Sequence, residues 1–348
     1  MMVVMKKNVL LSRFSNEPNN LLLTLPIKGH LPKQGIKWFF ILHILVFQGV
    51  SSIYGQQPSL ITHYMFTNMS INPAFAGNSG GISVTGLVRQ QWIGWKDSDG
   101  SKSAPQTFLL TVDSPLKFLH GGLGGSISQD QIGFFKNIAV KLGYAYKMDL
   151  GSGDLSMGLQ FNLQNISYDA SKFKGVDTED PILNGLEGKT SAMMVDMGAG
   201  VYYKVPEKYS VGFSVDNILQ TKAKKMAYQL RRTYYLTGGY QWNIPNHPAY
   251  ELLPSVQFMY DGAAFQLNAS LLVMYNNKFY GGLGYRLQDA LSVLAGVYIK
   301  NLRIGVAYDI STSAMSRYNN GGLEVLVNYC FKIDIDKFRK SYRNTRFL

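Results

Sequence analysis

The sequence predicts an all-β fold: a transmembrane antiparallel β-barrel of about 14 strands, with an N-terminal plug-like segment and a short C-terminal tail. Composition is the first reason. The 348 residues include 35 Gly and 22 Tyr but only 16% charged residues, and the mean hydropathy is −0.04. A water-soluble chain of this size usually carries more charge. The balance of polar and apolar residues instead suits strands with one wet face and one oil-facing face.

Strict alternation of apolar and polar residues is the second reason. In Asp154–Gln164, Leu, Met and Phe alternate with Ser, Gly, Gln and Asn, so successive side chains would point to opposite faces of a sheet. The same period recurs in 140–147, 265–273, 302–310 and 323–331. These segments run about 10–14 residues, as a tilted strand needs to cross a bilayer, where soluble strands average about 5–6.

The spacing of turn residues is the third reason, and it divides the chain into 14 expected strands. Their ranges are 81–92, 104–113, 121–129, 135–148, 153–168, 191–204, 208–217, 229–244, 250–260, 264–275, 278–288, 290–299, 301–310 and 321–332. An even count lets both ends of the barrel wall emerge on the same side of the membrane.

Connections between these segments differ in length. Every second one is mostly short and holds Gly, Pro or Asn, as in 149–153 and 276–277, whereas longer ones fall at 94–103, 170–190, 218–228 and 311–320. Short turns inside and long loops outside are typical of outer-membrane barrels. Aromatic pairs near segment ends, such as Tyr144/Tyr146 and Tyr202/Tyr203, fit the aromatic girdles of such barrels.

Residues 1–55 are interpreted as a leader and excluded from the fold. A signal peptide is expected at about 33–55, where two lysines precede the apolar run Trp38–Val50 and small or polar residues follow. The apolar run is too short for a comfortable helical span. Residues 1–32 do not resemble the start of a signal peptide, so we interpret them as an overextended start, with a genuinely long leader as the alternative. Export would place the mature chain in the cell outer membrane of a Gram-negative bacterium.

Charge and cysteine usage exclude other classes of protein. Without residues 1–55, which hold six Lys/Arg and one Glu, the formal charge falls from +12 to +7, and the remaining bases are scattered. Binding to nucleic acid is therefore not expected. Cys330 is the single cysteine, and no Cys/His spacing predicts a metal site. No catalytic set of side chains is recognisable, so we expect neither an enzyme nor a cofactor.

One irregular stretch, Tyr64–Gly77 (YMFTNMSINPAFAG), precedes the first strand, and it resembles the start of the mature PorP/SprF family proteins of the type IX secretion system. Further stretches similar to that family follow in order: 89–92, 104–107, 121–135, 144–150, 158–164, 321–331 and 342–348. The resemblance covers about 56–348. Departures from the family pattern are small: Thr67 stands where Asn is frequent, and Thr345 where Pro is expected.

The resemblance implies an accessory outer-membrane barrel of type IX secretion in Bacteroidetes-type bacteria. Such a protein would help to export or retain particular surface proteins, for example gliding adhesins. Its implied partners are outer-membrane lipid, the periplasmic ring and peptidoglycan-linked components, and the C-terminal domain of a secreted surface protein. The alternative function is a channel or porin-type transporter of small solutes. A purely structural barrel is a third reading.

Within this reading, residues 56–80 are expected to be an N-terminal segment at the periplasmic side or in the lumen, ahead of a barrel at 81–332. Irregular backbone is tolerated inside a barrel, where lumen side chains and water satisfy it. The predicted plug residues are Tyr64, Met65, Phe66, Met69, Asn72, Pro73 and Phe75. A disordered leader is the alternative, although the many apolar residues argue against disorder.

Three further sets of residues are candidate sites. The basic tail 333–348 would be periplasmic, with Arg346, Phe347 and Leu348 as a docking anchor for a partner; a solvated tail or a signal for barrel assembly is the alternative. At the barrel rim, Arg89, Trp92 and Trp95 are predicted to anchor the interface or contact cargo. Asp177, Glu179 and Asp180 are weak candidates for a cation site, and a solvated outer loop is the favoured reading.

Overall fold

The computed structural model describes residues 58–96, 103–169, 188–224, 226 and 228–332. Tyr54–Leu348 form one compact unit, and the other unit, Met1–Ile53, lies outside the described residues. The expected signal peptide, the docking anchor Arg346, Phe347 and Leu348, and the acidic side chains Asp177, Glu179 and Asp180 also lie outside them. Those expectations stay predictions.

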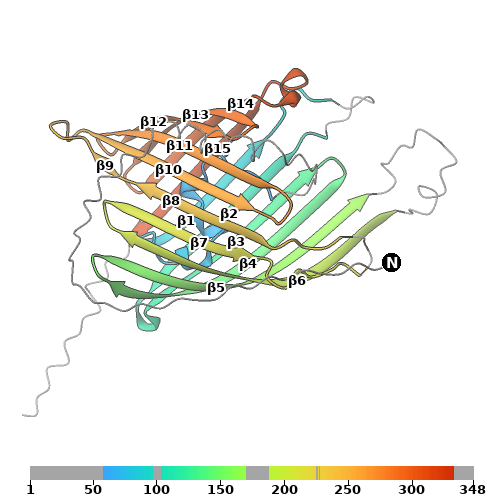
Figure 1. Ribbon diagram of the computed structural model, residues 1–348, viewed down its shortest axis with the longest axis horizontal. Coiled ribbons are helices and arrows are strands. Elements are labelled where there is room, and N and C mark those ends of the chain that lie inside the picture. The colour runs from blue at the N-terminus through green and yellow to red at the C-terminus, as the bar shows by residue number, and fades with distance from the viewer. Residues whose placement is uncertain (1–57, 97–102, 170–187, 225, 227, 333–348) are drawn as a thin grey trace, which may run out of the picture. The chain divides into compact units, whose positions relative to one another are not determined.

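The described part of the chain is almost entirely β-strand, and the strands follow one another around a closed antiparallel sheet (Figure 1). The strands are β1 (Gly81–Gln90), β2 (Gln106–Leu116), β3 (Gly121–Ile132), β4 (Phe135–Leu150), β5 (Gly153–Asp169), β6 (Lys189–Val205), β7 (Tyr209–Asp216), β8 (Thr233–Tyr240), β9 (Trp242–Asn243), β10 (Tyr250–Tyr260), β11 (Phe265–Tyr275), β12 (Phe279–Arg286), β13 (Ala290–Ile299), β14 (Leu302–Ser311) and β15 (Gly322–Lys332).

Closure of the sheet takes place where the first strand meets the last. β1 pairs with β2 on one side and with β15 on the other, from Gly81 opposite Lys332 to Gln90 opposite Leu323. β10 likewise pairs with both β8 and β11, so 14 strands form a ring and the two-residue β9 is a short addition beside β10. A closed ring leaves no unpaired edge in the bilayer. The prediction of an all-β, 14-stranded antiparallel barrel is confirmed.

Most predicted strands differ from the observed bounds by one to three residues, and one differs by more. The sequence pattern joined 229–244 into one strand, but β8 begins only at Thr233. Ahead of it, Lys222 and Gln229 form an isolated antiparallel β-bridge. The nearby buried side chains Ala223 and Leu230 pack against Ile166 and Met194. That packing competes with extension of the strand.

The two faces of the wall have opposite character. Large apolar side chains point outward and remain exposed; Leu142 is 64% and Leu159 71% accessible. Polar side chains point inward and are buried, with Asn162 and Asp196 at 0%. This is the reverse of a soluble protein, in which buried side chains are mostly apolar. It is the arrangement expected when the outer face meets lipid and the inner face encloses a polar lumen.

The two ends of the barrel differ in their connections. At the short-turn end lie 117–120, 151–152, 206–208, 276–278 and 300–301; β1 starts and β15 finishes there. At the long-loop end, the connections from β1 to β2, β5 to β6, β7 to β8 and β14 to β15 are long in sequence, and 133–134, 261–264 and 287–289 are short. Tight turns at the first end use left-handed backbone, for example at Asn276 and Asn277, with φ of 51° and 54°. The predicted division therefore holds in part: the longest connections share one end, but short turns occur at both ends, and the connection 241–249 at the short-turn end is longer than the rest there.

The described helices are all short 3₁₀ turns. They are η1 (Tyr64–Phe66), η2 (Asn68–Ser70), η3 (Pro73–Phe75), η4 (Lys117–Leu119) and η6 (Ala314–Arg317). Three of the five fall before β1, in the blue segment that Figure 1 shows among the strands. Within the described residues, no helix has the length and apolar character to cross a membrane.

The outward face allows a first test of the fold. Leu159→Arg would place a charge on the lipid-facing side of β5, and we expect it to destabilise the folded barrel by about 2–4 kcal/mol near the bilayer midplane. Urea unfolding in phospholipid vesicles measures the change. Leu159→Met, of similar volume, is the control and should unfold as the parent does. Equal stability of the Arg variant would contradict a lipid-facing position.

Candidate functional site

The described part of the N-terminal segment, residues 58–80, runs along the lumen from the long-loop end to the short-turn end. Thr62 and His63 contact Glu324, which lies two residues into β15 at the long-loop end. Further along, Tyr64 contacts Ser255 and Ser270 in the middle of β10 and β11. The segment therefore touches inward side chains on opposite parts of the wall.

A buried ionic cluster holds the start of this segment. Glu324 Oε2 accepts from the backbone N–H of Thr62 at 2.9 Å, and Glu324 Oε1 accepts from that of His63 at 2.7 Å. The ring Nδ1 of His63 also lies 2.7 Å from Glu324 Oε1. One carboxylate thus binds two successive peptide groups and the ring. It fixes the conformation of the chain at this point.

Two arginines and a second carboxylate complete the cluster. Arg89 Nη1 lies 3.0 Å from Glu324 Oε2, and Arg89 Nη2 lies 2.6 Å from Asp309 Oδ2. Thr62 Oγ1 accepts from Arg89 at 2.6 Å and from Arg286 at 2.9 Å, and it lies 2.9 Å from Asp309 Oδ1. Arg286 Nη1 also lies 2.9 Å from Asp289 Oδ2 and 3.6 Å from Asp309 Oδ2, so each buried arginine has carboxylate partners, as burial of a charge requires.

The position of Arg89 corrects the sequence prediction. It was assigned to the rim with Trp92 and Trp95, but it is 2% exposed and points into the lumen. The reason is its register on β1, where it stands opposite Glu324 of β15. Sequence reasoning missed Glu324, Asp309 and Arg286 as partners. A charged residue at an inward-facing position in each of three predicted strands could have indicated these partners.

Trp92 and Trp95 lie beyond β1 in the first long loop. Their ring centroids are 6.1 Å apart, and Trp95 contacts Tyr318 of the last long loop at 6.2 Å. Backbone hydrogen bonds join the same two loops, from Ile93 to Gly321 and from Asn320 to Ile93. The tryptophans therefore pack loops together over the β1–β15 junction. Their predicted anchoring in the interface stays a prediction.

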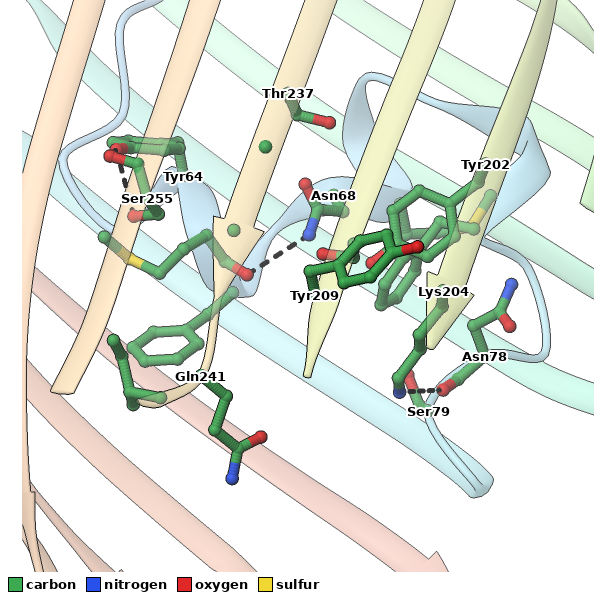
Figure 2. A pocket seen from close by; sticks show the side chains of 18 of the residues that line it. Tyr64, Asn68, Asn78, Ser79, Tyr202, Lys204, Tyr209, Thr237, Gln241 and Ser255 are labelled. Atoms are coloured by element: carbon green, nitrogen blue, oxygen red, sulfur yellow. Dashed lines mark hydrogen bonds between the residues drawn. The ribbon is translucent and has the colours of Figure 1, made fainter. Parts of the chain in front are cut away.

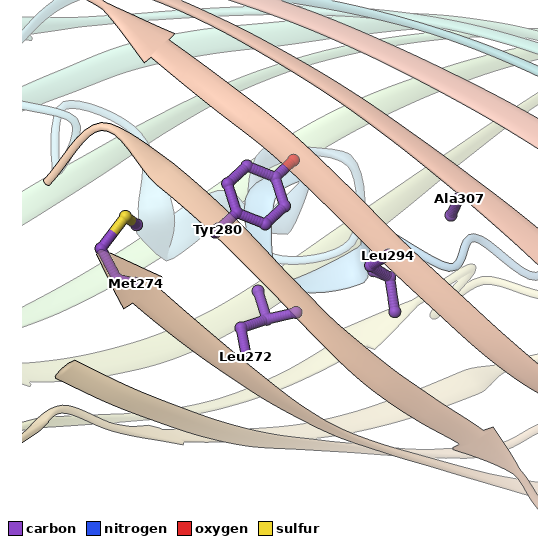
Figure 3. Close-up of a cluster of buried hydrophobic side chains, with 5 residues drawn as sticks. All are labelled: Leu272, Met274, Tyr280, Leu294 and Ala307. Carbon is purple, nitrogen blue, oxygen red and sulfur yellow. The ribbon is translucent and has the colours of Figure 1, made fainter. Parts of the chain in front are cut away.

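In the middle of the lumen, the segment covers an apolar patch on the inner wall. Figure 3 shows the patch: Leu272, Met274, Tyr280, Leu294 and Ala307 from β11 to β14. Met65 and Phe66 pack against it. Tyr64 donates its hydroxyl to the carbonyl of Ser255 at 2.9 Å, and burial raises the pKa of this phenol. This apolar part of the inner wall is thereby removed from water.

Towards the short-turn end, glycines let the segment approach the wall backbone. A Cβ on Gly158 would lie 2.4 Å from the backbone of both Pro73 and Ala74. A Cβ on Gly200 would lie 2.2 Å from Asn72 Oδ1. Asn72 accepts from the N–H of Ala74 at 2.9 Å and donates to the carbonyl of Val201 at 3.2 Å. Asn72 thus caps a turn and docks it on β6.

The remaining predicted plug residues also meet the wall. Met69 is 3% exposed and belongs to a buried cluster with Ala145, against which Phe75 packs. Phe75 also meets Tyr202 edge-on, with ring centroids 5.4 Å apart. The structure thus brings all seven predicted residues against the inner wall. Whether the segment stops the passage of solutes stays a prediction.

A cavity of about 430 Å³ lies between the segment and the wall. Figure 2 shows side chains that line it, of which Tyr64, Asn68, Asn78 and Ser79 belong to the segment. Lys204, Tyr209 and Gln241 belong to β6, to β7 and to the link after β8. Glu207 and Lys208 in the exposed turn after β6 also line it, so the cavity reaches the surface at the short-turn end. Within the described residues, no three His, Cys, Asp or Glu side chains are placed to hold a metal ion.

Comparison with known proteins gives one match to a family. A family model described as "Type IX secretion system membrane protein PorP/SprF" matches residues 53–329. No curated protein matches this chain.

Several solved structures are similar to this chain. The Ralstonia pickettii toluene transporter TbuX is 14% identical, with a TM-score of 0.46, over 79% of this chain and 95% of that one. The CymD monoaromatic hydrocarbon channel is 11% identical, with a TM-score of 0.47, over 83% and 97%. A Pseudomonas aeruginosa FadL homologue is 12% identical, with a TM-score of 0.41, over 75% and 93%. None of these three likenesses bears on the function of this chain.

Removal of one charge from the ionic cluster should destabilise the barrel. Glu324→Gln keeps the side-chain volume but removes one of the two carboxylates that pair with Arg89, the other being Asp309, and breaking a buried pair costs about 3–5 kcal/mol. Urea unfolding in vesicles should register a loss of that size. Glu207→Gln, in an exposed turn, is the control and should change little. If the Glu324 variant unfolds like the parent, the cluster does not carry the stability assigned to it.

A side chain that displaces the N-terminal segment from the wall should expose the segment to protease while the barrel stays folded. Gly158→Val places side-chain atoms where the Pro73–Ala74 backbone lies, so we expect chymotrypsin to cleave after Phe75. Mass spectrometry identifies the cleavage site, and retention of the folded band in unheated gels reports an intact wall. Gly86→Ala is the control, because its Cβ would meet only a carbonyl oxygen at 4.0 Å. Protection of Phe75 in the Gly158 variant would contradict the docking.

Proposed function

Because this chain belongs to the PorP/SprF family of type IX secretion system membrane proteins, we propose that it is an accessory outer-membrane β-barrel of that system. It binds particular secreted proteins and helps to export them or to retain them at the cell surface. Gliding adhesins are the kind of cargo we have in mind. The signal peptide at about 33–55 directs the chain to the cell outer membrane.

The observation that carries this proposal is the extent of the family match. Residues 53–329 include the N-terminal segment and almost the whole of the barrel wall. The matched part is therefore the structural unit itself, including the ionic cluster residues His63, Arg89 and Glu324.

Occupation of the lumen favours binding over passage. The segment 58–80 contacts the wall at both ends and in the middle, through Glu324, Ser270 and Gly158 among others. A channel for small solutes, which is the second candidate function, needs a continuous path past these contacts. A scaffold needs only its two ends, each of which can bind a different partner.

Orientation assigns those partners. With short turns in the periplasm, the short-turn end faces the periplasmic ring and peptidoglycan-linked components, and the tail with Arg346, Phe347 and Leu348, which follows β15 in the sequence, is proposed as a docking element for these partners. The long loops, including Trp92 and Trp95, face outward, where the C-terminal domain of a secreted surface protein is held. Outer-membrane lipid surrounds the wall. The proposed activity is binding, and it includes no catalytic step.

Deletion of the gene tests the proposal directly. We expect one or a few large surface proteins to disappear from the secreted and surface fractions, with other type IX cargo unchanged, because an accessory component serves particular clients. Quantitative mass spectrometry of both fractions measures this, and re-expression of the intact gene is the control. An unchanged secretome with altered uptake of small solutes would replace the scaffold by the channel.

A further inference from the structure

Apolar side chains of the N-terminal segment line the cavity at the short-turn end. Met65, Phe66 and Phe75 line it together with polar wall groups, among them Ser210 and Thr237. Its volume of about 430 Å³ falls within the range of about 300–1,000 Å³ for pockets that bind small ligands. It is reached from the short-turn end, inside the ring of strands. A single extended chain fits such an entrance better than a folded domain does.

Three cations line this cavity, and none of them forms an ion pair among the described residues, although Asp113 and Asp154 lie near enough to act on the charge of Lys204. Lys204 donates only to the carbonyl of Asn78, at 3.5 Å, and Lys208 lies in the exposed turn after β6. Arg303 lies over the rings of Phe66 and Tyr298, 4.1 and 4.6 Å from their centroids, and its Nε has no hydrogen-bond partner. The ion pairs of the described lumen involve other side chains, such as Arg89 and Lys141.

The acidic groups that line the same cavity are fewer than its cations. Asp113 accepts from the N–H of Gly77 at 3.2 Å and from the hydroxyl of Ser79 at 2.9 Å, and its charge also acts on Lys204. Glu207 and Lys208 are neighbours in the same exposed turn. Three cations against the two carboxylates of Asp113 and Glu207 leave the lining with one net positive charge. Its position beside aromatic and Met side chains calls for a ligand with both an anionic group and apolar groups.

We propose that this cavity is a binding site for an extended acidic peptide segment of a periplasmic partner, in which Asp or Glu alternates with large apolar residues. Its carboxylates meet Lys204, Lys208 and Arg303, and its apolar side chains pack under Met65 and Phe66. The site rests on the proposed function in one respect, which is the periplasmic orientation of the short-turn end. It names the chemistry by which that end recognises a partner.

Binding of short peptides to the full-length mature protein in detergent micelles tests the site. The probes are Asp-Phe-Glu-Leu-Asp and its amide counterpart Asn-Phe-Gln-Leu-Asn, each carrying the same uncharged dye, and fluorescence anisotropy gives the affinity. We expect the acidic peptide to bind at least tenfold more tightly. Equal affinity of the two peptides, or no binding of the acidic one, overturns the proposal.

A charge-reversal variant distinguishes loss of the binding site from loss of folding. In the double variant Lys204→Glu/Lys208→Glu we expect the preference to invert, so that Lys-Phe-Lys-Leu-Lys binds more tightly than the acidic peptide. Lys278→Glu, in another turn of the same end but outside the cavity, is the control and should keep the parent's preference. A double variant that still prefers the acidic peptide overturns the site.

A lipid headgroup could supply an anion beside apolar groups as well, so dodecyl phosphate is included as a competitor. Displacement of the acidic peptide only at concentrations well above the peptide's own Kd supports a peptide site, and tighter binding of dodecyl phosphate overturns it. The outcome is separable from that of the gene deletion. An unchanged secretome would sink the secretion role while leaving peptide binding intact, and a failure of peptide binding would leave the secretion role standing.

Discussion

The ion pair between Arg89 and Glu324 is the contact on which the rest of the arrangement depends. The two residues stand opposite one another on β1 and β15, the strands whose pairing closes the barrel. Their side chains meet inside the wall, where Glu324 also binds the backbone of Thr62 and His63. Closure of the wall and placement of the N-terminal segment therefore share one carboxylate, that of Glu324. A barrel open at this seam would leave a buried arginine without its carboxylate, and a lumen without the segment would leave that carboxylate short of three hydrogen bonds.

Groups inside the barrel are closely packed, as in the core of a soluble protein, but many of the contacts are made by backbone rather than by side chains. At Gly158 and Gly200 the absence of a Cβ lets an irregular chain lie directly on a strand. Elsewhere the segment uses its own aromatic side chains to cover the apolar patch around Leu272 and Leu294. Close contact at the glycines and burial at the patch act together, since each keeps the segment in the register that the other needs.

The wall could be predicted from the sequence because its information is local. Side chains alternate with period two, so Asp154–Gln164 reveals a two-faced strand without knowledge of its neighbours. The interior could be predicted only in part. The aromatic content of Tyr64–Gly77 indicated a packed segment, but the role of Arg89 depends on Glu324, which lies 235 residues away. The pairing register between the first and last strands cannot be predicted from the sequence of either strand alone. The predicted bounds of β8 were wrong for a related reason, because the bridge between Lys222 and Gln229 and the packing of Leu230 involve residues whose local pattern suits a strand.

The N-terminal segment inside the lumen affects what a barrel of this size can do. The N-terminal segment joins the two ends physically: its start is held by Glu324 near the long loops, and its finish by Asp113 near the short turns. The same segment also lines the cavity at the short-turn end, through Met65 and Phe66. A ligand in that cavity would touch the same three-residue turn, Tyr64–Phe66, that directly follows the ionic cluster. One short stretch of chain thus makes contacts near both ends of the protein, and such a connection would suit the proposed binding function.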